Sequence, residues 1–485
     1  MIYLAKKLKL FFQKSTTMQR WSMELATKQK NILENLEERL PRYTSYPAAP
    51  HFDEVSHHDH RVWLQNISVD EDLSIYIHIP YCKQLCWFCG CNTSVANTYK
   101  PVTEFIDALS EEIQLLANLL TDSQKRKVRH VHFGGGSPTL LSVEDFDRLM
   151  GVLTFQFDLS EVGEIAIEID PRTIDEDKIK CYASNHITRA SLGVQDFDPK
   201  VQKAINREQA EELIASTFAS LRKNGINKIN MDLIFGLPQQ TLEGVIETAK
   251  KAVALDPSRI SLFPYAHVPW MKKHQLLINE EQIADKDTRL KMAKAMRQVF
   301  IDAGYLAIGM DHFAKPNDSL IKAKENKRLK RNFQGYSDEK ADILIGLGPS
   351  AISKLPDGYV QNQPNTKLYK EDIWQGQLAS YKGHALSNED KVFAKVIEEL
   401  MCHYSVDLDD VAKNYNFDTE IFSPSLERIF AIEGLGESGL INIENDKISM
   451  SQENPILVRA VASRFDQYLP EGNANSSPKQ YSKLA

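Results

Sequence analysis

The stretch LSIYIHIPYCKQLCWFCGCN, residues 73–92, joins a strand-like run to four cysteines. Residues 73–80 are mostly apolar and rich in isoleucine, which predicts a buried β-strand. The cysteines follow at once with the spacing C-x3-C-x2-C-x-C, and they are four of the six in the chain. Thiolates gathered in one short loop are typical ligands of an iron–sulfur cluster. The stretch therefore predicts a strand that ends in a cluster-binding loop.

Other uses of clustered cysteines fit this loop less well. A structural zinc site usually needs two paired knuckles separated by a loop, and only one cluster of cysteines is present. Disulfides form in oxidising compartments, and we expect none because the N-terminus does not have the form of a secretory leader. Core cysteines scatter through a sequence instead of clustering. Zinc and redox roles stay open as alternatives to iron–sulfur chemistry.

Six strand-like runs alternate with helical patterns after this point. Such βα units in series predict a parallel sheet with right-handed crossovers. The repeat loses its regularity after residue 270, so we predict a partial (βα)6 TIM-like barrel, not a complete eight-stranded one. The predicted strands are residues 73–80, 128–133, 164–170, 189–195, 228–235 and 259–266.

Polar residues gather where these strands end. In barrels the functional groups lie at the carboxyl ends of the strands, so these residues are expected to meet. Each polar side chain could instead bond only to backbone or to a neighbouring cation, and the glycines could form only a tight turn. Tyr76 and His78 share one face of the first strand, as functional groups or as ordinary barrel interior. The strand-end group comprises Gly134–Gly136, Glu168, Gln195, Arg207 and Asp232.

The remaining parts of the chain suggest further divisions. We predict an N-terminal extension and lead-in helix (1–40), a catalytic barrel domain (41–384), a small, mainly α, winged-helix-like domain (385–470) and a disordered tail (471–485). A basic run between residues 322 and 331 is either a solvated helix face or a surface that faces an anion. Residues 1–22 are basic, and Met18 or Met23 is an alternative start to Met1.

Composition excludes several classes of protein. The 485 residues are 42% hydrophobic and 26% charged, as expected of a globular protein. The net charge of −8 argues against a nucleic-acid-binding protein. No apolar run approaches the roughly 20 residues of a membrane span. We expect a cytoplasmic protein, which suits an oxygen-sensitive cluster.

The C-x3-C-x2-C element resembles the cluster loop of the radical S-adenosylmethionine (SAM) superfamily. The resemblance implies that Cys82, Cys86 and Cys89 bind a 4Fe-4S cluster and leave one iron open for SAM, whose cleavage yields a 5′-deoxyadenosyl radical. Cys91 could be a ligand by spacing alone, but the pattern of the superfamily leaves it off the cluster.

A set of longer motifs resembles one family in particular, the oxygen-independent coproporphyrinogen III oxidases of haem biosynthesis. The resemblance extends from about residue 41 to residue 465. The cysteine loop identifies only the superfamily, whereas PRYTSYP, the CGCN ending, GMDHF and NFQGY are specific to this family. The motifs are PRYTSYP (41–47), YIHIPYCKQLCWFCGCN (76–92), HFGGGSPT (132–139), IEIDPR (167–172), LGVQDF (192–197), NREQ (206–209), MDLIFGLP (231–238), GMDHFA (309–314) and NFQGY (332–336).

This resemblance implies two bound SAM molecules and a set of site residues. Tyr76, Gly135, Glu168 and Ile352 match positions around the cluster-bound SAM. Phe88, Gly136, Ser137, Gln195, Arg207, Asp232 and Ala266 match positions around the second. Tyr76, His78 and Cys91 are the candidate catalytic residues. Pro264 stands where relatives often have asparagine, and it lacks a backbone donor.

The implied reaction is the oxidative decarboxylation of two propionates of coproporphyrinogen III to vinyl groups, which gives protoporphyrinogen IX. The implied partners are this substrate and a low-potential electron donor such as flavodoxin or ferredoxin, and the implied state is a monomer that binds neither nucleic acid nor membrane. Arg42, Arg331 and the 322–331 run are candidate propionate contacts. Rival functions are haem trafficking, another tetrapyrrole radical reaction and a winged-helix sensor, but trafficking relatives typically lack PRYTSYP and CGCN.

Overall fold

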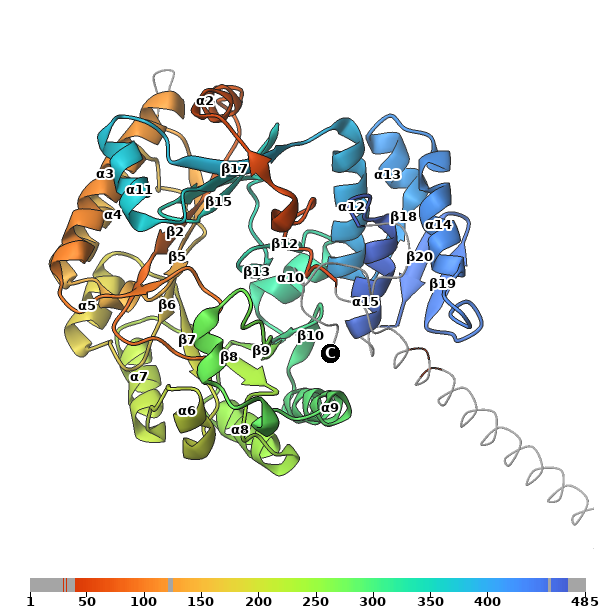
Figure 1. Ribbon diagram of the computed structural model, residues 1–485, viewed down its shortest axis with the longest axis horizontal. Coiled ribbons are helices and arrows are strands. Elements are labelled where there is room, and N and C mark those ends of the chain that lie inside the picture. The colour runs from red at the N-terminus through yellow and green to blue at the C-terminus, as the bar shows by residue number, and fades with distance from the viewer. Residues whose placement is uncertain (1–28, 30–31, 33–39, 121–124, 452–454, 470–485) are drawn as a thin grey trace, which may run out of the picture. The chain divides into compact units, whose positions relative to one another are not determined.

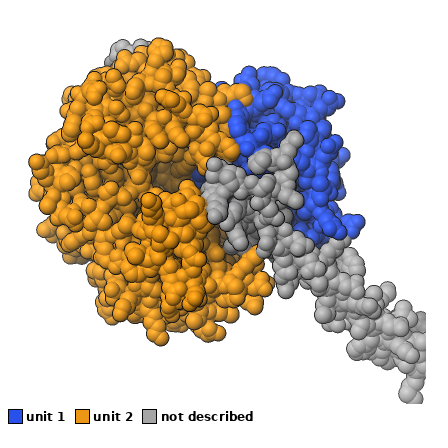
Figure 2. All heavy atoms as spheres, viewed as in Figure 1, with its two compact units in different colours: residues 1–46, 388–484 blue, residues 47–387, 485 orange. Residues whose placement is uncertain are grey.

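The computed structural model describes residues 29, 32, 40–120, 125–451 and 455–469. They divide into two compact units. The larger unit comprises residues 47–387, and the smaller comprises residues 388 onward together with the described residues before 47 (Figure 2). The predicted alternative starts and the predicted tail lie outside the described residues. No described helix combines the length and apolar composition needed to cross a membrane.

Six parallel strands form the centre of the larger unit. They lie side by side in the order in which they occur along the chain, which confirms the predicted partial barrel (Figure 1). The register places Ile77 beside Phe133 and Ile167 beside Ala190, so apolar residues of neighbouring strands share one face. The strands are β2 (Leu73–Ile79), β5 (Val128–Gly135), β6 (Glu164–Ile169), β7 (Arg189–Gln195), β8 (Lys228–Phe235) and β9 (Arg259–Pro264).

Helices cover the outer face of this curved sheet (Figure 1). The longest, α3 (Lys100–Leu120), carries Phe105, Leu109 and Ile113 at helical spacing, and all three are fully buried. This apolar stripe packs with the alternate residues Ile75 and Ile77 of β2 in one core. The other covering helices are α4 (Val143–Gln156), α5 (Glu176–Ser184), α6 (Pro199–Ala204), α7 (Glu211–Lys223) and α8 (Leu242–Ala254).

The sheet continues beyond the six predicted strands. A seventh parallel strand, β14 (Ile343–Leu347), pairs with β2, and antiparallel strands extend both edges into an open sheet of thirteen strands among the described residues. The sequence did not predict β14, because its five residues carry no alternation. The added strands are β15 (Ile352–Leu355), β16 (Gly358–Asn362), β17 (Ser380–Ala385) and β1 (Asp53–Glu54) at one edge, and β11 (His312–Ala314) and β10 (Leu306–Ile308) at the other.

The larger unit contains further elements outside the regular repeat. Helix α9 (Lys286–Asp302) begins at Lys286, because the Asp285 side chain accepts the Thr288 N–H and caps the helix there. The remaining elements of this unit are α2 (His57–Gln65), β3 (Tyr81–Cys82), β4 (Ser94–Val95), α10 (Ser319–Glu325), β12 (Lys330–Asn332), β13 (Gly335–Ser337), α11 (Thr366–Trp374) and the short 3-10 turns η1 (Ala49–His51), η2 (Pro138–Leu140), η3 (Lys273–Leu277) and η4 (Glu280–Gln282).

The smaller unit combines helices with a small sheet. Its strands β18 (Ser405–Asp407), β19 (Ile441–Glu444) and β20 (Lys447–Met450) form an antiparallel sheet with β20 in the centre. The helices are α12 (Asn388–His403), α13 (Leu408–Asn414), α14 (Ser423–Phe430) and α15 (Pro455–Ala462), with 3-10 turns η5 (Thr419–Phe422) and η6 (Ser463–Phe465).

Most of the PRYTSYP motif packs within this smaller unit. The Tyr43 hydroxyl donates to Asp466 at 3.1 Å, and Arg459 donates to the carbonyls of Leu40 and Pro41. The motif is not uniformly extended, because Tyr43 has a φ of 48° and turns the chain. These contacts tie residues 40–46 to the C-terminal helices, whereas the sequence suggested that the barrel domain begins at residue 41.

Candidate active site

The cysteine loop leaves the carboxyl end of β2 and is held by the end of β5. Strands β3 and β4 pair and close the loop, while Gly136 N donates to Ile79 O at 2.7 Å. A Cβ at Gly136 would lie 2.4 Å from Thr93 Oγ1, and Gly135 has a φ of 112°. Only glycine fits both positions. The glycines therefore let the chain after β5 approach the cysteine loop directly.

Each of the three predicted ligand sulfurs has a polar hydrogen directed at it. The Thr93 hydroxyl donates to Cys82 Sγ at 3.2 Å, and the Cys91 backbone N–H donates to Cys89 Sγ at 3.3 Å. The guanidinium groups of Arg172 and Arg207 lie 3.4 and 3.5 Å from Cys86 Sγ. Donors and cations around sulfur stabilise a thiolate, which is the form that binds iron.

The pKa values of the thiols differ along the loop. Burial is the main cause that raises the pKa of Cys82 to about 11; the Thr93 hydrogen bond lowers this pKa, and the neighbouring Cys89 and Cys86 raise it. The hydrogen bond from the Cys91 side chain is the main cause that lowers the pKa of Cys89 to about 7. The same bond raises the pKa of Cys91, so Cys91 is the proton donor of this pair. This contact joins Cys91 to the sulfur of Cys89, one of the three predicted ligands.

The donor set of the loop fits a cluster better than a single ion. Among the described residues, no three His, Cys, Asp or Glu side chains converge closely enough to hold one metal ion. A cubane cluster separates its thiolate ligands by its own width, so its cysteines need not converge on one point. Two buried nitrogens beside the loop, Arg172 Nη1 and Arg207 Nε, have no hydrogen-bond partner in the described part of the chain. Such orphaned donors indicate that an anionic group belongs here.

Glu168 projects from β6 into the barrel below the loop. Its carboxylate accepts the Gly135 N–H at 3.3 Å and lies 3.3 Å from His132 Nε2. The side chain remains 41% exposed, unlike the other carboxylates on the inner strands, so it is accessible to a ligand. His132 stacks on Tyr76 with 5.8 Å between ring centroids, which continues the polar lining onto β2.

Tyr76 and His78 form a fixed pair on the inner face of β2. The Tyr76 hydroxyl lies 3.0 Å from His78 Nδ1, and His78 Nε2 lies 2.8 Å from the Asn92 carbonyl. A carbonyl only accepts, so Nε2 carries the proton and Nδ1 accepts from the tyrosine. Burial lowers the pKa of His78 and raises that of Tyr76. The pair is therefore neutral and links the inner face of the barrel to the cysteine loop.

Arg207 joins three of the predicted site segments. Its guanidinium donates to Gly193 O at 2.5 Å, lies 3.3 Å from Asp170 and contacts Cys86. Gln195 follows at a bulge between β7 and β8, where its φ of 68° turns the chain at the strand end. Arg207 is buried, and these contacts hold it at the carboxyl end of β7, beside the cysteines.

The other predicted residues lie at different depths. Asp232 accepts from Ser191 and Asn230 at 2.9 and 2.8 Å, and burial raises its pKa. Ser137 is buried and bonds to Thr139. Phe88 packs with apolar residues after β8 and β9, Ala266 is exposed, and Ile352 begins β15.

Sequence reasoning missed the residues that hold the cysteine loop from the other side. Lys272, His274 and Gln275 contact the backbone carbonyls of Cys91, Cys89 and Phe88 at 3.0, 2.8 and 3.0 Å. They follow β9, where the regular repeat ends, so no pattern indicated them. Arg172 and Asp170 were within the quoted IEIDPR motif, and their charges next to a strand end were a usable signal.

The basic run divides between two environments. Lys322, Lys327 and Arg328 are exposed, as expected of a solvated face. Arg331 is buried, lies 3.8 Å from Asp311 and stacks over Tyr336 at 4.5 Å. These two partners are internal to the fold, and the role of Arg331 as a propionate contact stays a prediction.

Comparisons with known proteins agree with this geometry. The radical SAM superfamily model matches residues 76–252, the segment from β2 to α8. The chain is 41% identical to the oxygen-independent coproporphyrinogen III oxidase of Bradyrhizobium diazoefficiens, covering 90% of this chain and 96% of the relative. It is 38% identical to the protein of that name from Paracoccus denitrificans, covering 91% and 97%. The solved coproporphyrinogen III oxidase of Escherichia coli, described as a radical SAM enzyme, has a TM-score of 0.83 and 36% identity, covering 88% of this chain and 98% of that one.

Proposed function

This chain belongs to the oxygen-independent coproporphyrinogen III oxidase family of radical SAM enzymes, and we propose that it converts two propionates of coproporphyrinogen III to vinyl groups. The product is protoporphyrinogen IX, a precursor of haem. The observation that carries the proposal is the cysteine loop itself, set at the carboxyl end of β2 with two guanidinium groups against one sulfur. The inner strands place polar groups below it.

Cys82, Cys86 and Cys89 are the proposed ligands of one 4Fe-4S cluster. When bound, the cluster and SAM supply the 5′-deoxyadenosyl radical that takes a hydrogen atom from the substrate. The Thr93 hydroxyl and the Cys91 N–H stabilise the ligand thiolates, and Arg172 and Arg207 offset their charge. Such outer contacts orient ligands and tune a metal site.

Tyr76, Gly135, Glu168 and Ile352 are proposed to hold the SAM beside the cluster. The exposed Glu168 carboxylate suits the ammonium group or ribose hydroxyls of SAM, since it carries the charge and the acceptors that they need. Tyr76 stands beside it on β2. The neutral Tyr76–His78 pair offers no charge to the reacting carbon, so we assign both residues to positioning.

A second SAM is proposed on the β7–β9 side of the loop. Arg207, with one unpartnered nitrogen in the described structure, suits a carboxylate, and Gln195 and Asp232 add hydrogen-bonding groups. Phe88, Gly136, Ser137 and Ala266 complete this proposed site. Pro264 removes one backbone donor at its edge, and the Gly136 N–H already donates to Ile79, so neither position offers a backbone donor to this SAM.

We further propose the wider setting of the enzyme. It acts as a cytoplasmic monomer, receives electrons from a low-potential carrier such as flavodoxin or ferredoxin, and binds neither nucleic acid nor membrane. Its catalytic barrel lies within residues 41–384 and its C-terminal domain within 385–470, and residues 40–46 pack with the latter. A radical reaction of this kind requires tight positioning and exclusion of water.

Anaerobic turnover tests the function. Reconstituted protein is incubated with coproporphyrinogen III, SAM and dithionite, and the products are separated by chromatography. Monovinyl and divinyl products are expected, with SAM binding at two sites per chain by calorimetry. Haem binding without turnover would instead favour the trafficking function, and one SAM per chain would remove the second site.

A further inference from the structure

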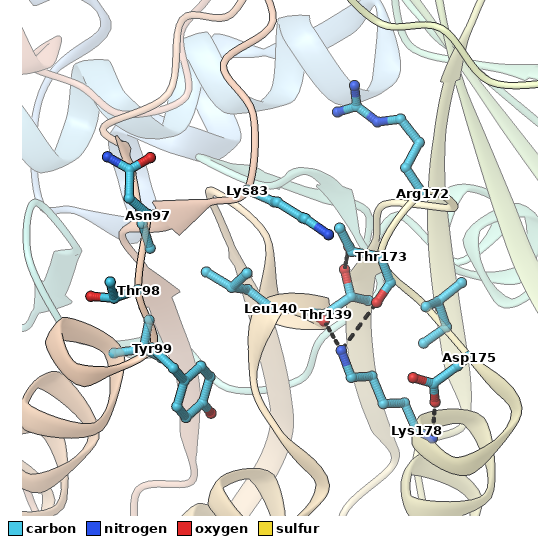
Figure 3. A pocket seen from close by; sticks show the side chains of 13 residues that line it. Lys83, Asn97, Thr98, Tyr99, Thr139, Leu140, Arg172, Thr173, Asp175 and Lys178 are labelled. Carbon is cyan, nitrogen blue, oxygen red and sulfur yellow. Dashed lines mark hydrogen bonds between the residues drawn. The ribbon is translucent and has the colours of Figure 1, made fainter.

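A cavity of about 470 Å³ opens beside the cysteine loop, away from the barrel interior. It is lined by loops at the carboxyl ends of β5 and β6 and by the first turns of α3 and α5 (Figure 3). Tyr76, His78 and Glu168, which face the barrel interior, do not line it. The cavity is therefore distinct from the proposed SAM sites. Its charged lining comprises Lys83, Arg172, Lys178 and Asp175, with Thr98, Thr139 and Thr173 beside them.

The cavity is positively charged in a chain whose net charge is −8. Lys178 donates to the carbonyls of Thr139 and Thr173 at 2.6 and 3.1 Å. In the described structure neither Lys178 nor Lys83 has a carboxylate within ion-pair distance. Figure 3 shows both ammonium groups on the same side of the cavity, beside Thr173. Asp175 adds one carboxylate to the lining, so three cations and one anion face the cavity, and the excess of positive charge favours an anionic group.

The cavity also lies next to the proposed cluster ligands. Lys83 directly follows Cys82 in the chain, and Arg172 extends from the lining to within 3.4 Å of Cys86 Sγ. The opposite side of the loop faces Arg207 and the barrel interior, where SAM and substrate are proposed to bind. An electron carrier needs an approach to the cluster from outside the barrel interior, and this cavity offers one that is lined by basic side chains.

We propose that this cavity is the docking site of an acidic one-electron carrier protein, whose surface carboxylates meet Lys83 and Lys178. The inference rests on the proposed function and identifies where the electron donor of that reaction binds. One electron passes from the reduced carrier to the cluster, so that the carrier is oxidised and the cluster is reduced by one electron each. No proton or group is transferred. Weak encounters of this kind depend on charge complementarity, which raises the association rate.

The test compares a protein carrier with a small reductant. The double variant Lys83→Gln/Lys178→Gln is reconstituted, and cluster reduction by reduced flavodoxin is followed by stopped-flow absorbance and EPR at low ionic strength. We expect reduction by flavodoxin to slow about tenfold, with a difference that shrinks as salt is added. Reduction by dithionite should change less than about twofold, because it needs no docking surface. Lys180→Gln, an exposed lysine of the same helix that does not line the cavity, is the matched control.

Three outcomes would overturn the docking proposal. Unchanged reduction by flavodoxin in the double variant places the carrier elsewhere. An equal loss with flavodoxin and dithionite means that the lysines only support the loop. If Lys180→Gln slows reduction by flavodoxin equally, the effect reflects the overall charge of the protein and not this cavity. These readouts concern the cluster alone, so they remain valid if coproporphyrinogen III is not turned over, and failure of the proposed function is recognised separately.

Discussion

The two ends of the barrel use buried arginine and carboxylate residues in opposite ways. At the amino end, Arg189 donates to Glu164 at 2.8 Å and lies 3.6 Å from Asp318, while Arg259 pairs with Asp318 at 2.7 Å. At the carboxyl end, Arg207 lies 3.3 Å from Asp170 but also faces the Cys86 thiol, and Glu168 is 41% exposed. The charges of the amino end (the paired end) contact one another, whereas those of the carboxyl end (the open end) also contact a thiol and include an accessible carboxylate.

The partners of a charged side chain, and not its residue type, therefore distinguish a structural role from a functional one. A buried charge is costly unless it is paired, so a folded protein tolerates open pairing chiefly where a ligand supplies the partner. Residues of the paired end should affect stability more than chemistry. Residues of the open end should affect chemistry more than stability, and the following experiments test both statements.

The largest effect is expected at the cysteine loop. Cys82→Ala removes one of three proposed ligands, and turnover should fall by at least about a millionfold, the lower end of typical enzymatic accelerations. Iron content and the EPR signal after anaerobic reconstitution should fall with it. Cys181→Ala, a buried cysteine of α5, should keep both. A Cys82→Ala protein that retains cluster and turnover would contradict the ligand assignment.

Arg189→Met tests the paired end. It leaves Glu164 and Asp318 buried with fewer counter-charges, and the free energy of unfolding should fall by about 3–5 kcal/mol. Chemical denaturation of the reconstituted protein measures this change, while iron content per folded chain should stay the same. Arg148→Met, at an exposed arginine that pairs with Asp107, should cost less than about 1 kcal/mol. If Arg189→Met lost the cluster but kept its stability, the amino end would have a functional role instead of a structural one.

The sequence could predict the open end better than the paired end. Cysteine spacing and polar residues within or at the end of apolar strands are local signals, and they indicated Glu168, Gln195 and Asp232, whereas Arg207 follows α6. Parallel strands bring their carboxyl ends to one edge, so order along the chain predicted proximity.

The paired end depends on contacts that no local pattern contains. Asp318 precedes α10, far along the chain from Arg189 and Arg259, and only the packed fold joins them. The same limit applies to Lys272 and His274, which reach the cysteine loop from beyond the regular repeat. Strand β14 was missed because five apolar residues do not distinguish a strand from a buried helical turn.

Glu112 is a third kind of buried carboxylate, held by neutral donors only. It accepts from Tyr369, Gly348 and Asn362, and burial raises its pKa to about 7. A raised pKa means that its contribution to stability is complete below the unfolded pKa near 4.5 and is lost as the pH rises through 7. The loss should approach about 3 kcal/mol, at about 1.4 kcal/mol per unit of pKa difference. Denaturation from pH 5 to pH 8 should show a smaller decline in Glu112→Gln, and equal slopes would exclude this account.

Arg207→Lys gives the smallest effect and the sharpest test of the open end. Lysine keeps the charge but loses the planar fork that reaches Gly193, Asp170 and Cys86 together. Turnover should fall about tenfold, through weaker SAM binding, while the free energy of unfolding changes by less than about 1 kcal/mol. Calorimetric titration with SAM measures the binding. The control is Lys203→Arg, a neighbouring exchange of one cation for another at an exposed residue. Arg207→Lys could instead lower the free energy of unfolding as much as Arg189→Met and leave SAM binding unchanged. The Arg207 ion pair would then be structural, like those of Arg189 and Arg259, and the two ends would not differ in kind.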